Sequence, residues 1–282
     1  MSDKSNFQNP LLDEILAHYE RGLEAERLLK RTNPIELVRT QELLSRYLPP
    51  PPAVIFDVGG GSGIYACWLA QLGYKVHLID PVPLHVEQAR FASQVQPDYP
   101  LASAEIGDAR QLNQANNSVD AVLLFGPLYH LIERNERIAA LREANRVLKS
   151  GGLVFAVACS RFASLLDGLF RGWLDDPEFV EIVHRDLLEG QHRNPSNHPA
   201  YFTTAFFHHP DQLKAEVEEA GLSCEKLLAI EGPGKLLQNF EEHWSEPSRR
   251  ERLLQAIRWI ETEPSTLGVS AHIIAIAKKV AV

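Results

Sequence analysis

An aspartate followed by closely spaced glycines is the part of the sequence best suited to chemistry. Asp57 ends a short apolar run, and the next six residues read VGGGSG. Glycines at 59, 61 and 63 allow a sharp turn, let a ligand lie against bare backbone and let the next helix start close to the strand. The pattern predicts a ligand-binding loop at the end of a β-strand.

Two nucleotide-type ligands compete for this loop. The dinucleotide fingerprint GxGxxG, counted from Gly59, would place its third glycine at position 64, which is isoleucine. In that fingerprint the strand residue that stands two positions before the first glycine is usually apolar. In this chain that residue is Asp57. An acid followed by GxGxG instead resembles motif I of the class I S-adenosylmethionine-dependent methyltransferases.

The resemblance continues in order along the chain. Asp80 ends the second expected strand, where the family places an acid on the two ribose hydroxyls. Asp108 follows the third, where the family's acid meets the adenine amino group. DAVLLFGPLYH over 120–130 resembles the fourth strand and its loop, and RVLKSGG over 146–152 resembles the turn before strand five, with Ser150 for the usual proline. The whole chain is similar to bacterial small-molecule methyltransferases that carry GPLYHL, GQHRNP and YFTTAFFH segments.

This resemblance implies S-adenosylmethionine as cofactor and S-adenosylhomocysteine as product. In relatives an N-terminal helix folds over the cofactor, which adds two residues before the glycine loop to the expected contacts. The expected cofactor-binding residues are Tyr19, Arg39, Asp57, Gly59, Gly61, Gly63, Asp80, Asp108, Ala109 and Phe125.

Methyl transfer from a sulfonium is an SN2 displacement, in which the protein mainly aligns the acceptor and excludes water. A base helps only if the acceptor must lose a proton, and histidine serves near neutral pH. His130 follows the fourth strand at the edge where acceptors bind in this fold, and His208 lies in the aromatic segment 201–209. These two are the catalytic candidates, and the acceptor-binding candidates are Tyr129, Arg161, Tyr201, Phe202 and His209.

Each candidate also has a structural interpretation. The segment 201–209 mixes rings and hydroxyls as an acceptor pocket requires, but it would equally fill the core of a cover domain. Arginines such as Arg161 are more often solvated than ligand-bound. The histidines between 184 and 209 lack HExxH or a similar metal-ligand spacing, so no metal is expected.

The elements that position these residues alternate between strands and helices. Apolar runs predict strands at 54–58, 75–79, 102–106, 119–125 and 153–158, with helices at 64–72, 84–92 and 133–148. Further on, 211–220 and 251–260 are expected as helices, and 227–230 and 269–277 as strands. The alternation predicts an α/β fold with a doubly wound, mostly parallel sheet. The resemblance implies seven strands in the order 3-2-1-4-5-7-6, with the last strand antiparallel.

The chain divides at composition changes. Apolar residues recur at helical spacing between 11 and 48, and four prolines follow at 49–52. We therefore expect an N-terminal helical lid over 1–52 and a methyltransferase domain over 53–282. The alternation stops at Ser160, which predicts a helical cover inserted at about 160–210.

The amino-acid composition argues against some classes of binding partner. There are 28 Lys and Arg against 37 Asp and Glu, a net charge of −9, which argues against nucleic acid or an anionic membrane. The start is polar, no apolar run is long enough to span a membrane, and the three cysteines form no CxxC pair. A cytoplasmic enzyme acting on a small-molecule acceptor is expected, with homodimer formation left open.

Three alternatives stay open. A nicotinamide-dependent oxidoreductase would use a similar sheet, an aminopropyl transferase would need acids to hold a polyamine, and a non-catalytic protein would bind cofactor without turnover. The FGPL sequence at 125–128 also departs from the Asn/Asp-Pro-Pro-Tyr/Phe clamp of nucleic-acid and glutamine N-methyltransferases.

Overall fold

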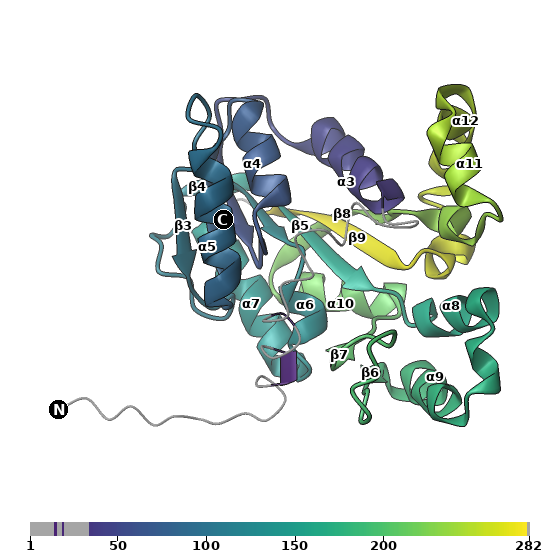
Figure 1. The fold of residues 1–282 in the computed structure, drawn as a ribbon. Coiled ribbons are helices and arrows are strands. Elements are labelled where there is room, and N and C mark those ends of the chain that lie inside the picture. Colours follow the sequence, from purple (N-terminus) through teal and green to yellow (C-terminus); the bar gives the residue numbers. More distant parts are fainter. Residues whose placement is uncertain (1–13, 16–18, 20–33, 281–282) are drawn as a thin grey trace.

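Seven strands form one sheet in the order β3-β2-β1-β4-β5-β9-β8 (Figure 1). The computed structural model describes Glu14, Ile15, Tyr19 and residues 34–280. The strands are β1 (Val54–Val58), β2 (Lys75–Asp80), β3 (Ser103–Ile106), β4 (Val119–Leu124), β5 (Leu148–Cys159), β8 (Leu222–Ala229) and β9 (His272–Lys279). The first five pair in parallel, and β9 runs antiparallel to both β5 and β8. The predicted fold and strand order are confirmed.

Helices cover both faces because the central strands are apolar on both sides. Ile55, Leu123 and Phe155 pack towards α3 (Pro34–Tyr47), α4 (Ile64–Gln71) and α5 (Pro83–Gln94). Phe56 and Val122 pack on the other face, towards α7 (Arg134–Val147) and α10 (Pro210–Glu219). These two buried layers hold the sheet rigid beneath the loops at its carboxyl edge.

The central strand β1 pairs with β2 on one side and with β4 on the other, so Asp57 lies opposite both Leu78 and Leu123. The chain leaves β1 towards α4 on one face and leaves β4 towards the other face. In open α/β sheets this divergence creates a crevice at the carboxyl ends of the strands. The glycine loop predicted from the sequence lies at this position.

The segment after β5 contains α8 (Ala163–Arg171), η1 (Trp173–Asp175) and α9 (Pro177–Glu189), and we call this part of the chain the cover. It also contains a small antiparallel sheet of β6 (Gln191–His192) and β7 (Ala205–Phe206), which was not predicted. Phe179, Ile182, Val183 and Tyr201 form its own core. A second cluster around Cys159, Ala205 and Phe207 joins the cover to the end of β5.

The remaining described elements are α6 (Pro127–His130), η2 (Gly232–Leu236), α11 (Phe240–Ser245), α12 (Pro247–Ile260) and η3 (Pro264–Val269). Helix α12 starts four residues before its predicted start, because Pro247 occupies its first turn and the Glu246 side chain accepts hydrogen bonds from the amides of Ser248 and Arg249. The helix expected from Leu11 onward lies largely outside the described residues.

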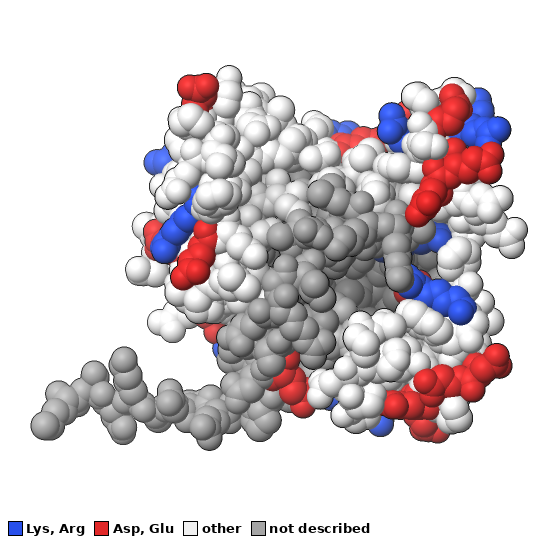
Figure 2. Space-filling model, in the orientation of Figure 1, with Lys and Arg blue, Asp and Glu red and all other residues white. Residues whose placement is uncertain are grey.

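None of the described helices is long and apolar enough to cross a membrane. Figure 2 shows acidic side chains along the lower right edge, where α9 lies, and both charge signs near α11 and α12. On this face the described Lys and Arg side chains stand among acidic ones instead of forming a single basic patch.

Candidate functional site

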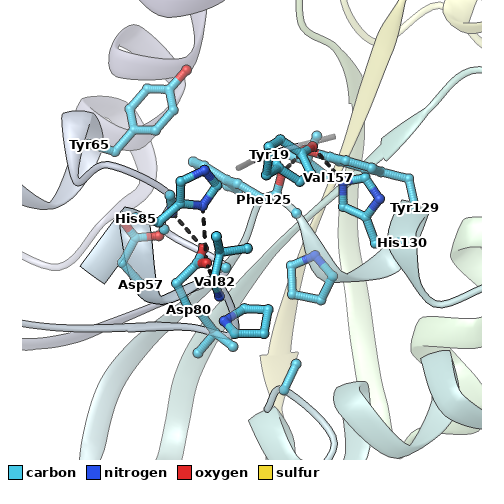
Figure 3. A pocket seen from close by; sticks show the side chains of 18 of the residues that line it. Tyr19, Asp57, Tyr65, Asp80, Val82, His85, Phe125, Tyr129, His130 and Val157 are labelled. Atoms are coloured by element: carbon cyan, nitrogen blue, oxygen red, sulfur yellow. Dashed lines mark hydrogen bonds and ion pairs between the residues drawn. The ribbon is translucent and has the colours of Figure 1, made fainter. Parts of the chain in front are cut away.

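A pocket opens at the carboxyl edge of the sheet, where β1 and β4 diverge (Figure 3). One half is lined by the glycine loop, Asp80, His85 and the segment 107–110. The other half lies over β4, β5 and β9 and is lined by residues that include Phe125, Tyr129, His130, Val157, Ile230 and His272, with Glu36 and Thr40 from α3. The pocket therefore combines a polar half with a half that is mostly apolar and aromatic.

The glycine loop fits closely between its neighbours. Gly59 has a φ of +74°, and a Cβ there would lie 2.6 Å from Cδ of Pro127. A Cβ on Gly60 would lie 2.7 Å from Oδ2 of Asp57. Gly61 also has positive φ and lines the pocket. The loop thus leaves backbone exposed to a ligand where side chains have no room.

Gly63 has a different role in the described structure. It precedes α4 with a φ of +87°, and a Cβ there would lie 3.1 Å from Cβ of Ala89 on α5. It does not line the pocket, although it was expected to bind cofactor. Its small size instead lets α4 start close to α5.

Asp57 is buried at the floor of the polar half. It is 0% exposed, and neither carboxylate oxygen has a hydrogen-bond partner among the described residues. Burial first and the nearby Asp80 carboxylate second raise the pKa of Asp57 to about 7, although the more distant amide of Ala66 lowers it. A buried carboxylate without partners is costly, and a cationic or hydrogen-donating ligand would stabilise it.

Asp80 is held in place by its neighbours. Its Oδ2 accepts from the amide of Gly61 at 2.9 Å, and its Oδ1 accepts from the amide of Val82 at 2.9 Å. Nδ1 of His85 lies 3.1 Å from the same Oδ1. His85 is 3% exposed, and its Nε2 has no partner among the described residues. The end of β2 therefore presents an oriented carboxylate and an imidazole to the pocket (Figure 3).

Asp108 lies at the far end of the polar half, next to Ala109. Its carboxylate accepts two hydrogen bonds from Nε of Arg110, at 3.0 and 3.1 Å, and one from the Arg110 amide at 2.8 Å. Arg110 also pairs with Glu136. Burial opposes ionisation of Asp108, but Arg110 outweighs it and lowers its pKa. Asp108 therefore lines the pocket as one member of an ion network.

Aromatic side chains dominate the second half. Phe125 and Tyr65 meet edge to face with ring centroids 5.3 Å apart. The Tyr129 hydroxyl donates to the carbonyl of Phe125 at 2.6 Å, which fixes the loop after β4. His130 follows in α6, and the Tyr19 hydroxyl lies 2.6 Å from its Nε2. Figure 3 shows Tyr19 beside Phe125 and Val157, with Tyr129 and His130 next to it.

A charged cluster borders this apolar half. Glu36 of α3 and His272 of β9 line the pocket, and Glu231 lies buried beside them. Nδ1 of His272 lies 2.6 Å from Oε1 of Glu231, and Nζ of Lys235 lies 2.9 Å from the same atom. Two acids and two cationic groups thus meet between α3, η2 and the start of β9.

His208 and Arg161 lie outside the pocket lining, under the cover. His208 is 0% exposed, and its Nε2 lies 3.3 Å from Oε2 of Glu216 on α10. Burial lowers the pKa of His208, although Glu216 opposes this. The Arg161 guanidinium donates to the carbonyl of Phe207 at 2.8 Å and to the Gln212 side chain at 2.6 Å. Both side chains connect the cover to the domain instead of facing a ligand.

The other residues of the aromatic segment are likewise placed away from the pocket lining. Tyr201 belongs to the core of the cover and donates to Asp176 at 2.6 Å. His209 is about half exposed and caps α10. Phe202 lies behind the pocket-lining residue His130, with the two ring centroids 5.9 Å apart. The segment 201–209 therefore fills the core of the cover and caps α10 more than it lines the pocket.

Arg39 is also outside the pocket lining. It is 0% exposed, donates to the carbonyl of Ile230 at 3.1 Å and pairs with Glu42 and Glu261. These contacts fasten α3 to the end of β8. Its neighbour one residue on, Thr40, does line the pocket.

Several lining residues were not identified from the sequence. His85 carries a readable signal, because it stands five residues after a strand-ending acid and at the start of a helix. Glu231 directly follows the expected strand 227–230 and His272 lies within the expected strand 269–277, but only the pairing of β8 with β9 brings them together. Glu36 depends on how α3 crosses the sheet, which sequence spacing does not define.

Comparisons with known proteins agree with this geometry. A family model described as a methyltransferase domain matches residues 56–156. A ubiquinone biosynthesis O-methyltransferase of Xanthomonas axonopodis pv. citri is 30% identical over 232 residues, which cover 80% of this chain and 85% of that protein.

Solved structures show the same fold at lower identity. A SAM-dependent methyltransferase from Methanosarcina mazei has a TM-score of 0.58 at 17% identity, covering 85% of this chain and 98% of that one. A possible histamine N-methyltransferase from Thermotoga maritima has a TM-score of 0.53 at 18% identity, covering 96% and 98%.

Proposed function

The chain belongs to the class I S-adenosylmethionine-dependent methyltransferases, and we propose that it transfers the methyl group of S-adenosylmethionine to an oxygen atom of a small molecule. The observation that carries this proposal is one pocket in which a glycine loop and an unpartnered buried Asp57 adjoin an apolar, aromatic half. Oxygen is chosen because the Xanthomonas relative is named an O-methyltransferase.

The polar half fits the cofactor. A Cβ on Gly59 or Gly60 would meet neighbouring atoms, so at these two positions the loop can meet a ligand only with its backbone. The unpartnered carboxylate of Asp57 suits the cationic end of a ligand that carries an ammonium and a sulfonium. Asp108 and Ala109 line the other end of this half and would contact the adenine.

Asp80 would accept from the ribose. A carboxylate offers about four acceptor positions, and the amides of Gly61 and Val82 and the ring of His85 occupy three of Asp80's. One position remains for a ribose hydroxyl. The existing bonds also hold the carboxylate in one orientation before the ligand arrives, which reduces the entropy lost on binding.

The apolar half would align the acceptor. When bound, the cofactor supplies a methyl group on a positively charged sulfur. Phe125, Tyr129 and Val157 would exclude water around the acceptor oxygen and orient it towards the methyl group. His130 lines the same half and is the proposed acceptor of a proton from a neutral hydroxyl.

The test separates binding from transfer. Isothermal titration with S-adenosylhomocysteine should show saturable binding at one site. Incubation with methyl-labelled S-adenosylmethionine and panels of hydroxyl, amine and thiol compounds should then label hydroxyl compounds. Failure to bind S-adenosylhomocysteine would contradict the cofactor assignment, and label confined to amines or thiols would contradict the assignment to oxygen.

A further inference from the structure

His272 is the pocket-lining cation of the apolar half. It is the first residue of β9 and pairs with Cys159, the last residue of β5. This register places its ring at the carboxyl edge of the sheet, in the wall formed with Val157 and Ile230. The cofactor loops belong to β1, β2 and β3, so His272 faces the part of the pocket left for the acceptor.

Glu231 holds this ring in one orientation. Its Oε1 lies 2.6 Å from Nδ1 of His272, and its Oε2 accepts from the amide of His272 at 2.9 Å. The Ser270 hydroxyl donates to the same Oε2 at 2.9 Å, and the Lys235 ammonium lies 2.9 Å from Oε1. Glu231 is 0% exposed. Four polar contacts thus fix the buried Glu231 carboxylate, which in turn orients the imidazole of His272.

The surroundings keep His272 cationic. Burial opposes the charged form, but Glu231 and Glu36 outweigh it, assisted by the Cys159 side chain, and raise the pKa of His272 to about 10. Nδ1 is committed to Glu231, so Nε2–H is the second donor of the protonated ring. A protonated imidazole cannot serve as a base, but it can bind an oxygen anion.

The same residues are not arranged for a metal ion. The ligand atoms of Glu36, Glu231 and His272 lie within 4.8 Å of one another. However, the Lys235 ammonium lies 2.9 Å from Glu231 and 3.7 Å from Glu36, where it supplies positive charge to both acids. A metal would have to displace this ammonium and remove the proton on His272 Nδ1.

We propose that His272, supported by Glu231, binds an acidic oxygen of the methyl acceptor, so that the preferred acceptors are phenols or enols that react as oxygen anions. This rests on the proposed function and specifies its substrate class. The acceptor hydroxyl gives its proton to His130 on binding, and His130 passes it to solvent. The acceptor oxygen then bonds to the methyl carbon as the carbon–sulfur bond breaks. The electron pair of the broken bond stays on sulfur. His272 stays protonated throughout.

The test uses para-nitrophenol, whose anion absorbs visible light, and benzoate as a second anionic probe. With the full chain saturated by S-adenosylhomocysteine, the wild type should lower the apparent pKa of bound para-nitrophenol. His272→Gln keeps a donor but removes the charge, and it should weaken anion binding about tenfold or more. Glu36→Gln should act in the opposite direction, because it removes a carboxylate 3.8 Å from Nδ1 of His272 that repels an anion, while Glu231 at 2.6 Å still keeps the ring cationic.

Opposite signs distinguish a binding role from a structural one. A purely structural cluster predicts that both substitutions weaken probe binding, and this result would overturn the proposal. It would also fail if neither probe binds the wild type, if His272→Gln binds them unchanged, or if zinc binds tightly and chelation abolishes probe binding. His184→Gln, at an exposed position on α9, is the matched control.

Binding of S-adenosylhomocysteine is measured for every variant. Similar affinity and thermal unfolding with this ligand show that the variants are folded. If the wild type does not bind S-adenosylhomocysteine, the proposed function fails before the acceptor question is reached. If it binds and only the His272 effect is missing, the acceptor inference alone is wrong.

Discussion

The Tyr19 hydroxyl lies 2.6 Å from Nε2 of His130, which joins a residue near the start of the chain to the loop after β4. The Tyr19 ring also meets the rings of His85 and His130 edge to face, at centroid distances of 5.1 and 5.2 Å. His85 belongs to the polar half of the pocket and His130 to the apolar half. One side chain therefore contacts both halves (Figure 3).

We expect Tyr19→Phe to lower the rate of methyl transfer about three- to tenfold, because it removes the hydrogen bond that positions His130 while keeping the ring. His130→Ala should lower the rate of methyl transfer further than Tyr19→Phe does. In a His130→Ala background, Tyr19→Phe should have little further effect, since the two residues act as a unit. Transfer rates of the four proteins give this double-mutant cycle. If Tyr19→Phe lowers the rate equally in both backgrounds, the Tyr19–His130 hydrogen bond does not contribute to methyl transfer. Tyr99→Phe, at an exposed site, is the control.

Asp57 should make the ligand-free protein less stable as pH rises. Its pKa is about 7 in the folded protein and near 3.8 in the unfolded chain, so between these values the folded state holds a proton that the unfolded state has lost. Stability then decreases with increasing pH over this range. Asp57→Asn should remove the decrease and stabilise the free protein at about pH 8 by a few kcal/mol, at about 1.4 kcal/mol per pKa unit. Denaturant unfolding at several pH values measures this, with exposed Asp98→Asn as control; parallel pH profiles for the wild type and Asp57→Asn would refute it.

Cofactor binding should release protons near neutral pH. A sulfonium or ammonium beside Asp57 favours its ionised form and lowers its raised pKa. Calorimetric titration of S-adenosylmethionine in buffers of different ionisation enthalpy should therefore show release of up to about half a proton at pH 7, rising towards one proton near pH 6. Asp57→Asn should abolish most of that release and weaken binding. A release unchanged in the variant would assign the proton to another group.

Asp80→Ala should weaken cofactor binding by about 1 to 3 kcal/mol, the cost of losing hydrogen bonds to a charged group. Asp80 also orders the loop through the amides of Gly61 and Val82, so part of the loss could come from the loop. A cofactor analogue without ribose hydroxyls separates the two effects, because it should bind both proteins with a much smaller difference. An equal loss for both ligands would reject the ribose role. Exposed Glu105→Gln on β3 should leave affinity unchanged.

Two ion pairs between α7 and α10 offer a matched comparison of stability. Arg137 and Glu216 are buried, with Arg137 Nε and Glu216 Oε2 2.9 Å apart, and the guanidinium carbon lies 3.7 Å from the ring centre of Phe206. Burial opposes ionisation of Glu216, but His208 and Arg137 lower its pKa to about 2. Glu216→Gln leaves the Arg137 charge buried and should cost about 3–5 kcal/mol of unfolding free energy.

The second pair, Arg134 with Glu219, is exposed on both sides. Glu219→Gln should change the unfolding free energy by less than about 1 kcal/mol. Denaturant unfolding of both variants, with S-adenosylhomocysteine affinity as a check on the pocket, makes the comparison. Similar losses for the two substitutions would contradict the assignment of His208 and its partners to a buried structural network.

The sheet could be predicted because its signals are local. The runs at 54–58 and 119–125 are apolar and bounded by turn residues, and the alternation with helices indicates a parallel sheet. The two-residue strands β6 and β7 have no periodicity to detect. Their pairing depends on how the chain between Gln191 and Phe206 folds back within the cover.

The polar half of the pocket was more predictable than the apolar half for the same reason. Asp57, Gly59 and Asp80 directly follow or end strands whose order can be inferred, so their meeting at one edge follows from topology. His272 and Glu231 are 41 positions apart and meet only through an antiparallel register that contains an irregularity between Cys224 and Lys226. His208 has the chemistry of a base, but it is buried against Glu216 outside the pocket lining, a position that its sequence context does not reveal.

The two halves of the pocket come from separate parts of the chain. The glycine loop, Asp80 and Asp108 lie within residues 57–108, whereas Glu36, Ile230 and His272 lie on either side of that stretch. Substitutions in the second group can change which acceptor is accepted without altering the residues proposed to hold the methyl donor. During divergence, or in laboratory selection for a new substrate, Glu36, Thr40, Ile230 and His272 are therefore the positions to vary first.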